Sequence, residues 1–356
     1  DAARADKGGK KTNHTGRDDR ATSEQVMDPR TRLMLFKLLN SGFMECIDGC
    51  LSTGKEANVY YAKAGVKAPE GAPADFAVKV FKTSILVFKD RDKYVSGEFR
   101  YRNGYCKSNP RKMVKTWAEK EMRNLRRLHA AGIPSPEPIL LKNHILVMEF
   151  LGENGWPAPR MKDAPLSPSK FRECYWQSVK LMRKMYQVCG LVHGDLSEYN
   201  MLYYPPRGGV IFIDVSQSVE DDHPCANEFL RKDCFNVNAF FKNKGGLDPM
   251  STRALYEFVI DSSIGEADED AAIERIQASA ASKDDVENDD AIFMEMFLPR
   301  SLMEVSNVEA DQRKARAGEQ EDAYASTVAS FLSQPQGRNT GVGAAHQDAE
   351  GDRDEA

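Results

Sequence analysis

Apolar and polar residues alternate along much of the first 151 residues, a pattern that predicts a strand-rich N-terminal lobe. Residues 29–40 differ, because Leu33, Phe36 and Leu39 recur there at helical spacing and predict a short amphipathic helix. Extended patterns bounded by turn-rich pieces predict four strands, at about 43–51, 56–63, 75–82 and 144–151.

The pattern changes to mainly helical spacing in the second half of the chain. A long helix over 113–131, stopped by Gly132, leads from the strands toward this half. Further along, the pattern predicts a helix at 169–189, short strands at 201–204 and 210–213, and helices within 226–297. Strands followed by helices indicate an α+β protein of two lobes with a cleft between them.

Both ends of the chain are polar and poor in large apolar residues. We therefore predict disorder at 1–22 and 306–356. The remainder divides into an N-terminal helix plus N-lobe at 23–151, which contains a basic connector at 83–112, and a helical C-lobe at 152–305.

Composition and charge narrow the class of protein. The 356 residues are 41% hydrophobic and 29% charged, with a net charge of -5, which is ordinary for a core-forming soluble chain and argues against general coating of DNA. Apolar runs are too short to span a membrane, and no signal peptide opens the chain. The seven cysteines are scattered without a CxxC pair, which favours a reducing, cytoplasmic setting.

The string LVHGDLSEYN at 191–200, followed by VIFID, carries the sharpest chemistry. Asp195 precedes Asn200 by five residues, as in the catalytic loop of protein kinases, and Asp214 follows fourteen residues later. Carboxylate and amide oxygens suit Mg²⁺. Taken alone, the same residues also fit simple turns. His193 is predicted to orient the loop or lie in the core, since no second His or Cys lies at ligand spacing.

Lys79 lies in the strand FAVKVF, which resembles the V-A-I-K strand that holds an ATP-binding lysine. On the helix that follows, Glu121 precedes Leu125 and Leu128 by one and two turns, so it borders the inward face and is the candidate partner of Lys79. Glu119 points away and is predicted to be solvated. A strand-end lysine and an exposed helical ion pair remain alternatives for these residues.

Two further segments are candidate nucleotide contacts. In HILVMEFLG, Met148 would line an adenine pocket, and the backbones of Glu149 and Leu151 would bind the adenine edge, although a plain core strand has the same pattern. The turn STGKEANVY offers Ser52, Lys55 and Val59. Gly49 to Lys55 also fits the start of a Walker A motif, but Glu56 stands where that motif needs Ser or Thr, and a strand follows instead of a helix.

Five long strings together resemble the RIO family of atypical protein kinases, in its type 1 branch. They include LVHGDLSEYNML and NGWPAPRMKD, and they lie at 52–62, 82–125, 154–163, 191–202 and 213–241. The resemblance covers about residues 26–305 and implies a trimmed, two-lobed protein-kinase fold. Asp214 is followed by Val-Ser instead of Phe-Gly, which agrees with a missing activation loop. Gly194 stands where the family pattern has Ala, and this departure suggests a looser loop.

The resemblance also implies roles and ligands. Lys79 would be the ATP-phosphate lysine with Glu121 as its partner, Asp195 the catalytic aspartate, and Asn200 and Asp214 the ligands of Mg²⁺. ATP would be the nucleotide and serine or threonine the acceptor. The family further implies an ATPase route in which Asp214 itself is phosphorylated.

The basic connector and the helix after it suggest a nucleic-acid partner. Residues 82–127 contain fourteen Lys and Arg against five Asp and Glu, interleaved with Phe88, Tyr94, Phe99, Tyr101, Tyr105 and Trp117. An ordinary solvated surface has the same composition. The resemblance implies a precursor of the small ribosomal subunit as the partner.

Three function classes follow from these observations. The first is a kinase or ATPase, the second a nucleotide-gated assembly factor, and the third an RNA-binding scaffold with a decayed kinase fold. The intact set of Lys79, Asp195, Asn200 and Asp214 argues against the third class.

Overall fold

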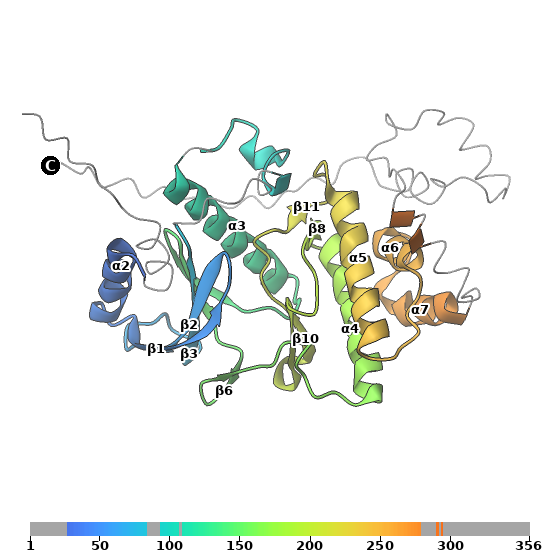
Figure 1. The fold of residues 1–356 in the computed structure, drawn as a ribbon, viewed down its shortest axis with the longest axis horizontal. Helices are drawn as coiled ribbons and strands as arrows, with labels where there is room; N and C mark the ends of the chain where they lie inside the picture. The colour runs from blue at the N-terminus through green and yellow to red at the C-terminus, as the bar shows by residue number, and fades with distance from the viewer. Residues whose placement is uncertain (1–26, 84–92, 107–108, 279–289, 292, 295–356) are drawn as a thin grey trace, which may run out of the picture.

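The computed structural model describes residues 27–83, 93–106, 109–278, 290–291 and 293–294 (Figure 1). The two segments predicted to be disordered, 1–22 and 306–356, lie outside these ranges. The described residues form the two-lobed α+β fold predicted from the sequence, with a sheet in the N-terminal lobe and packed helices in the C-terminal lobe.

A five-stranded antiparallel sheet forms the N-terminal lobe. Its strand order is β1 (Met44–Thr53), β2 (Ala57–Ala64), β3 (Asp75–Phe81), β5 (Ile145–Glu149) and β4 (Pro138–Lys142). Four of these strands are predicted to within two residues at each end. Strand β4 was missed because it is short and follows a proline-rich stretch that reads as a turn.

Side chains of β3 alternate between the two faces of the sheet. Phe76, Val78 and Val80 join a buried cluster on one face, whereas Ala77 and Lys79 point to the opposite face. Helix α2 (Pro29–Asn40) covers the first face and begins where the Asp28 carboxylate accepts two backbone N–H groups.

The extent of α2 confirms the prediction, but of the three residues whose spacing predicted the helix only Leu39 packs against the sheet cluster. Leu35 and Leu38 are buried against the sheet, whereas Leu33 and Phe36 are 54% and 57% exposed. Thr31 explains the orientation, because its hydroxyl is buried within 2.8 Å of His144 Nε2 and turns the face of residues 31, 35 and 38 inward.

Helix α3 (Pro110–Ala130) runs between the sheet and the helical lobe (Figure 1). It starts three residues before its predicted beginning because the Asn109 side chain caps the N–H groups of Arg111 and Lys112. Its buried face carries Trp117 and Glu121, and it continues through Leu125 and Leu128 as predicted.

The connector before α3 contains a short 3₁₀ segment, η2 (Phe99–Tyr101). Most of its described aromatic side chains are not available at the surface, so the prediction of an aromatic RNA-binding surface is wrong. Tyr94 and Trp117 are buried in the core, and Tyr101 and Tyr105 pack against it. Phe99 is 66% exposed, and Phe88 lies outside the described residues. The aromatic side chains therefore serve mainly to dock the connector.

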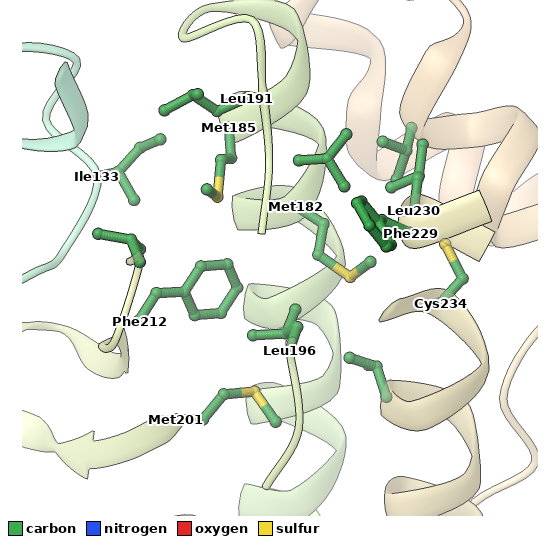
Figure 2. Packing of buried hydrophobic residues seen from close by; sticks show 14 of the residues in the cluster. Ile133, Met182, Met185, Leu191, Leu196, Met201, Phe212, Phe229, Leu230 and Cys234 are labelled. Atoms are coloured by element: carbon green, nitrogen blue, oxygen red, sulfur yellow. The ribbon is translucent and has the colours of Figure 1, made fainter. Parts of the chain in front are cut away.

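The described part of the C-terminal lobe contains the helices α4 (Pro168–Gln187), α5 (Ala226–Asn243), α6 (Thr252–Ile260) and α7 (Glu269–Ala278), with the 3₁₀ segment η4 (Glu266–Asp268) before the last. Helices within 226–278 confirm that part of the prediction. Of the rest of the predicted range, 290–291 and 293–294 are described and are helical, and the other residues lie outside the described part of the chain. Figure 2 shows Met182 of α4 beside Phe229 and Leu230 of α5, whereas Met185 of α4 lies on the side of Leu191 in the same cluster. Among the described helices, none is long and apolar enough to cross a membrane.

Small two-stranded ladders connect the lobes and hold the loops between them. They pair β6 (Gly152–Glu153) with β7 (Trp156–Pro157), β8 (Leu191–Val192) with β11 (Val219–Glu220), and β9 (Met201–Tyr204) with β10 (Gly209–Phe212), the last pair joined by η3 (Pro205–Arg207). Because β8 precedes the 193–200 loop and β10 precedes Asp214, these ladders place both segments beside the sheet lobe.

Candidate active site

A cavity of about 640 Å³ lies between the lobes and is large enough for a nucleotide. Its walls come from the β1–β2 turn, β3, α3, the segment that joins the lobes, and the residues around β9 and β10. The predicted site residues that line it are Ser52, Lys55, Val59, Lys79, Glu121, Met148, Glu149, Leu151, Asn200 and Asp214. Asp195 is not part of the cavity wall, but it contacts Asn200, which is.

Lys79 joins the two lobes through its ammonium group. Its Nζ lies 2.8 Å from Glu121 Oε1 and 2.8 Å from Asp214 Oδ1. Burial alone would lower the pKa of Lys79, but the two carboxylates together raise it above its ordinary value. Burial raises the pKa of Glu121 to about 7 against the opposing charge of Lys79. Lys79 is therefore a permanent positive charge at the cavity wall.

Asp214 follows β10 with a backbone φ of 59°, a left-handed conformation that is unusual for a residue with a side chain. Its Oδ1 accepts hydrogen bonds from Lys79 and from the Ser216 hydroxyl, the latter at 3.0 Å. Desolvation would raise the pKa of this carboxyl, but Lys79 and Ser216 bring it below the usual range. Within the described residues Oδ2 has no hydrogen-bond partner, and the side chain is 41% exposed.

Asp195 and Asn200 are held together in the loop after β8. Asn200 Nδ2 donates to the Asp195 carbonyl at 2.8 Å and to Asp195 Oδ2 at 3.2 Å. The Asn200 carbonyl accepts the Ile213 N–H at 3.0 Å, which ties the loop to the residue before Asp214. Burial, and then the charge of Asp214, raise the pKa of Asp195.

Asp233 of α5 supports this loop and was missed in the sequence. Its two carboxylate oxygens accept the N–H groups of Gly194 and Leu196, each at 2.8 Å. Gly194 has a φ of +82°, and a Cβ there would lie 3.0 Å from the Gln217 carbonyl, so glycine suits the position and the loop is fixed instead of loose. The sequence feature that could have identified Asp233 is its position on the apolar face of a helix, between Leu230 and Val237, where an acidic residue is unusual.

His193 is buried beside the same loop, as predicted, with 3% of its surface exposed. Its Nε2 lies 3.1 Å from the Ile213 carbonyl, and the Asp195 N–H donates to Nδ1. These partners fit a neutral ring that carries its proton on Nε2. Burial lowers the pKa of His193 to about 4.

This buried histidine predicts a loss of stability in acid. Its pKa is lower in the folded chain than in the unfolded chain, so its contribution is complete above about pH 6.5 and is lost as pH falls toward 4. The loss amounts to at most about 3 kcal/mol. We expect the difference in unfolding free energy between wild type and His193→Gln, measured with denaturant from pH 7.5 to 4.5, to narrow on acidification. A constant difference would contradict a neutral buried ring.

The β1–β2 turn contains an unpredicted contact between the lobes. Gly54 N–H bonds the Ala57 carbonyl, which closes a hairpin, and β2 follows as a strand, so the Walker A alternative is excluded. Arg160 Nη2 donates to the Ser52 hydroxyl at 3.0 Å across the mouth of the cavity. This contact could not be predicted from local sequence patterns, because the two residues are 108 positions apart.

The segment that joins the lobes offers one backbone donor. The Glu149 N–H already donates to the Glu137 carbonyl at 2.8 Å, whereas the Leu151 N–H has no partner within the described part of the chain. The Glu149 carboxylate also pairs with Arg207 of η3 at 2.5 Å. Among these groups, Leu151 N–H is therefore the donor available to a base edge.

A family model described as RIO domain matches residues 58–255, which is more than half of the chain. The chain belongs to the RIO family. Serine/threonine-protein kinase RIO1 of Homo sapiens is 56% identical over 301 residues, covering 82% of this chain and 51% of the human protein. Serine/threonine-protein kinase rio1 of Dictyostelium discoideum is 51% identical over 312 residues, covering 86% and 53%. These relatives confirm the predicted resemblance to the type 1 branch.

This RIO-family chain spans about half the length of the curated relatives it matches. Among solved structures, the Rio2 kinase-ADP/Mg2+-phosphoaspartate complex from Chaetomium thermophilum is similar with a TM-score of 0.48 and 20% identity. That match covers 70% of this chain and 76% of the other.

Proposed function

We propose that this RIO-family chain is an ATP- and Mg²⁺-dependent protein serine/threonine kinase. The observation that carries the proposal is the position of Lys79, held between Glu121 and Asp214 at the wall of a nucleotide-sized cavity. The Asp195–Asn200 pair lies beside it. The relatives are named serine/threonine-protein kinases, which supports the same activity.

Each residue then has a role that its chemistry permits. Leu151 N–H binds the adenine edge, with Met148 and Val59 along the base and Ser52 and Lys55 on the phosphate side. Lys79 binds the phosphates and neutralises part of their charge. Asp195 orients the acceptor hydroxyl and takes its proton as the hydroxyl oxygen bonds the γ-phosphorus and the bond to the ADP oxygen breaks.

The donor set fits a magnesium ion. Asn200 uses its amide nitrogen on Asp195, which leaves Oδ1 as an acceptor, and Asp214 Oδ2 has no partner among the described residues. Both are hard oxygen ligands of the kind Mg²⁺ prefers. When bound, the ion neutralises phosphate charge that Lys79 alone cannot balance.

The proposal is tested with the full chain and γ-labelled ATP. We expect label to pass to serine or threonine hydroxyls of an acceptor protein as acid-stable phosphate, and to stop when EDTA removes Mg²⁺. Absence of any Mg²⁺-dependent ATP consumption would contradict the proposal.

A second candidate function is an ATPase that uses Asp214 as the phosphate acceptor. Asp214 favours this route in two ways: its Oδ2 has no hydrogen-bond partner in the described part of the chain, and its side chain is 41% exposed. This oxygen can attack the γ-phosphorus while Lys79 stays on Oδ1. ADP leaves, and water then hydrolyses the aspartyl-phosphate. In this case the nucleotide cycle would gate binding to an assembly partner.

We further propose a precursor of the small ribosomal subunit as the partner of the basic connector and α3. Exposed basic side chains on these segments support it; they include Arg100, Arg102, Arg111, Lys112 and Lys115. The buried aromatic residues restrict the proposed contact to phosphates, with Phe99 as an exposed exception.

Reversing the charges of Arg100, Arg102 and Arg111 to glutamate is expected to weaken association with precursor particles by roughly tenfold or more, and to reduce its salt dependence. Co-sedimentation at several salt concentrations measures both effects. The control reverses Lys63, Lys67 and Lys142, which are also exposed but lie outside the connector and α3. Equal binding of the two triple variants would contradict this surface.

A further inference from the structure

Residues 94–101 of the connector dock between α3 and α5, beside the catalytic loop. The Tyr94 ring stacks on Phe229 of α5 with centroids 4.8 Å apart and meets Trp117 of α3 edge-on at 6.2 Å. A Cβ at Gly194 would lie 3.7 Å from the same ring. Tyr94 therefore contacts α3, α5 and the loop that carries Asp195.

A buried ion pair fixes the connector to α3. Lys120 Nζ donates to Glu98 Oε1 at 2.5 Å and to the Tyr94 carbonyl, and the two charged side chains are 2% and 7% exposed. Burial lowers the pKa of Lys120 and raises that of Glu98, so each charge is held at a desolvation cost. Buried pairs add little net stability, but their directed bonds fix the relative position of two segments.

Lys120 is the neighbour of Glu121 on α3, and Asn124 lies one turn further along the same side of the helix. Asn124 Nδ2 donates to the carbonyls of Val215 and Ser218 at 2.9 and 3.3 Å, which anchors α3 to the segment after Asp214. Helix α3 is thus attached to the connector by Lys120 and to the 215–218 segment by Asn124. Glu121, between these anchors in sequence, meets Lys79.

We propose that Lys120, through Glu98 and the Tyr94 carbonyl, is a positioning residue that sets α3 so that Glu121 reaches Lys79. The connector then helps to position the residues that bind the nucleotide, in addition to forming part of the surface. This inference rests on the proposed ATP-dependent function, and it assigns to Lys120 no contact with the nucleotide.

A double-mutant cycle on the full chain tests whether Lys120 acts through Glu121. Lys120→Met is expected to lower kcat/KM for ATP by on the order of 10- to 100-fold, as a displaced helix should. Glu121→Gln should have an effect at least as large. In the Glu121→Gln background, Lys120→Met should add less than about twofold, because the contact it supports is already lost.

Two further variants serve as controls that separate the effect of Lys120→Met on activity from its effect on folding stability. Glu98→Leu/Lys120→Met removes both buried charges, so we expect stability to return while kcat/KM stays low. Leu128→Ala opens a cavity at a buried α3 residue that does not line the nucleotide cavity, so it should lower stability without reproducing the coupling to Glu121. Fully multiplicative effects of Lys120→Met and Glu121→Gln would overturn the proposal, as would wild-type kcat/KM in the charge-free variant.

A structural measurement separates this inference from the proposed function. If the wild-type chain shows no Mg²⁺-dependent ATP turnover, the proposed function fails, and the crystal structure of Glu98→Leu/Lys120→Met still decides the role of Lys120. We expect Glu121 to have moved out of contact with Lys79. An unchanged 2.8 Å contact between them would overturn the inference.

Discussion

Replacing Asp195 by alanine is expected to lower ATP turnover by on the order of 10²–10⁴ while nucleotide affinity changes by less than about threefold. Asp195 does not line the cavity wall, so a bound nucleotide loses little when its carboxylate is removed. Asn200 keeps its 2.8 Å hydrogen bond to the backbone carbonyl at position 195, so the metal ligand stays in place. The loss falls on the step that needs an oriented acceptor hydroxyl.

Single-turnover kinetics and equilibrium binding of an ATP analogue measure the two quantities separately. Asp268→Asn, an exposed aspartate in the helical lobe, is the matched control and should leave both unchanged. If Asp195→Ala lost affinity and turnover in equal proportion, the residue would be a binding group instead of a catalytic one.

Replacing Asp214 by asparagine is expected to abolish the increase in nucleotide affinity and in turnover that Mg²⁺ gives the wild-type chain. The change removes a carboxylate that holds Lys79 and an oxygen that we assign to the ion. We expect turnover to fall by roughly 10³-fold. Nucleotide binding in Mg²⁺ should become as weak as in EDTA, because the ion loses its charged protein ligand.

Titrations with and without Mg²⁺ test this loss, and labelling with γ-labelled ATP tests the alternative ATPase route in the same variant. A hydroxylamine-labile phosphate present in wild type should be absent in Asp214→Asn. Survival of that phosphate would exclude Asp214 as the acceptor, and survival of the Mg²⁺ effect would contradict its role as a ligand.

The period of apolar residues along a strand or helix predicted the direction of those site side chains that a single element positions. The alternating pattern of β3 places Lys79 on the face opposite Phe76 and Val78, and helical spacing places Glu121 with Leu125 on the inward side of α3. Local sequence therefore made Glu121 the candidate partner of Lys79 while leaving alternatives open for both residues, and the 2.8 Å contact between the two side chains decides between them.

Contacts between distant segments were not predictable in this way. Lys120 resembles any solvated helix lysine in sequence, yet Glu98 and the Tyr94 carbonyl bury it. Glu149 and Arg207 pair across 58 residues, again with no local pattern. Such pairs form only when segments that are distant in sequence fold together, so charge and spacing within one segment carry no signal for them.

For apolar side chains too, the sequence alone did not predict which residues are buried, as the orientation of α2 and the basic connector show. Leu33 and Phe36 have helical spacing as good as that of Leu35 and Leu38, and the buried contact of Thr31 with His144 decides between the faces. In the connector, the count of aromatic residues predicted Tyr94 as a nucleic-acid contact, but its burial against Phe229 makes it a docking residue.

A crystal structure of the full chain with Mg²⁺ and a non-hydrolysable ATP analogue tests the central claim most directly. We predict the phosphates against Lys79 Nζ, a metal ion at about 2.1 Å from oxygens of Asn200 and Asp214, and the base edge at Leu151 N–H. A nucleotide bound elsewhere, or bound in the cavity with Asn200 and Asp214 both turned away from the ion, would contradict the account.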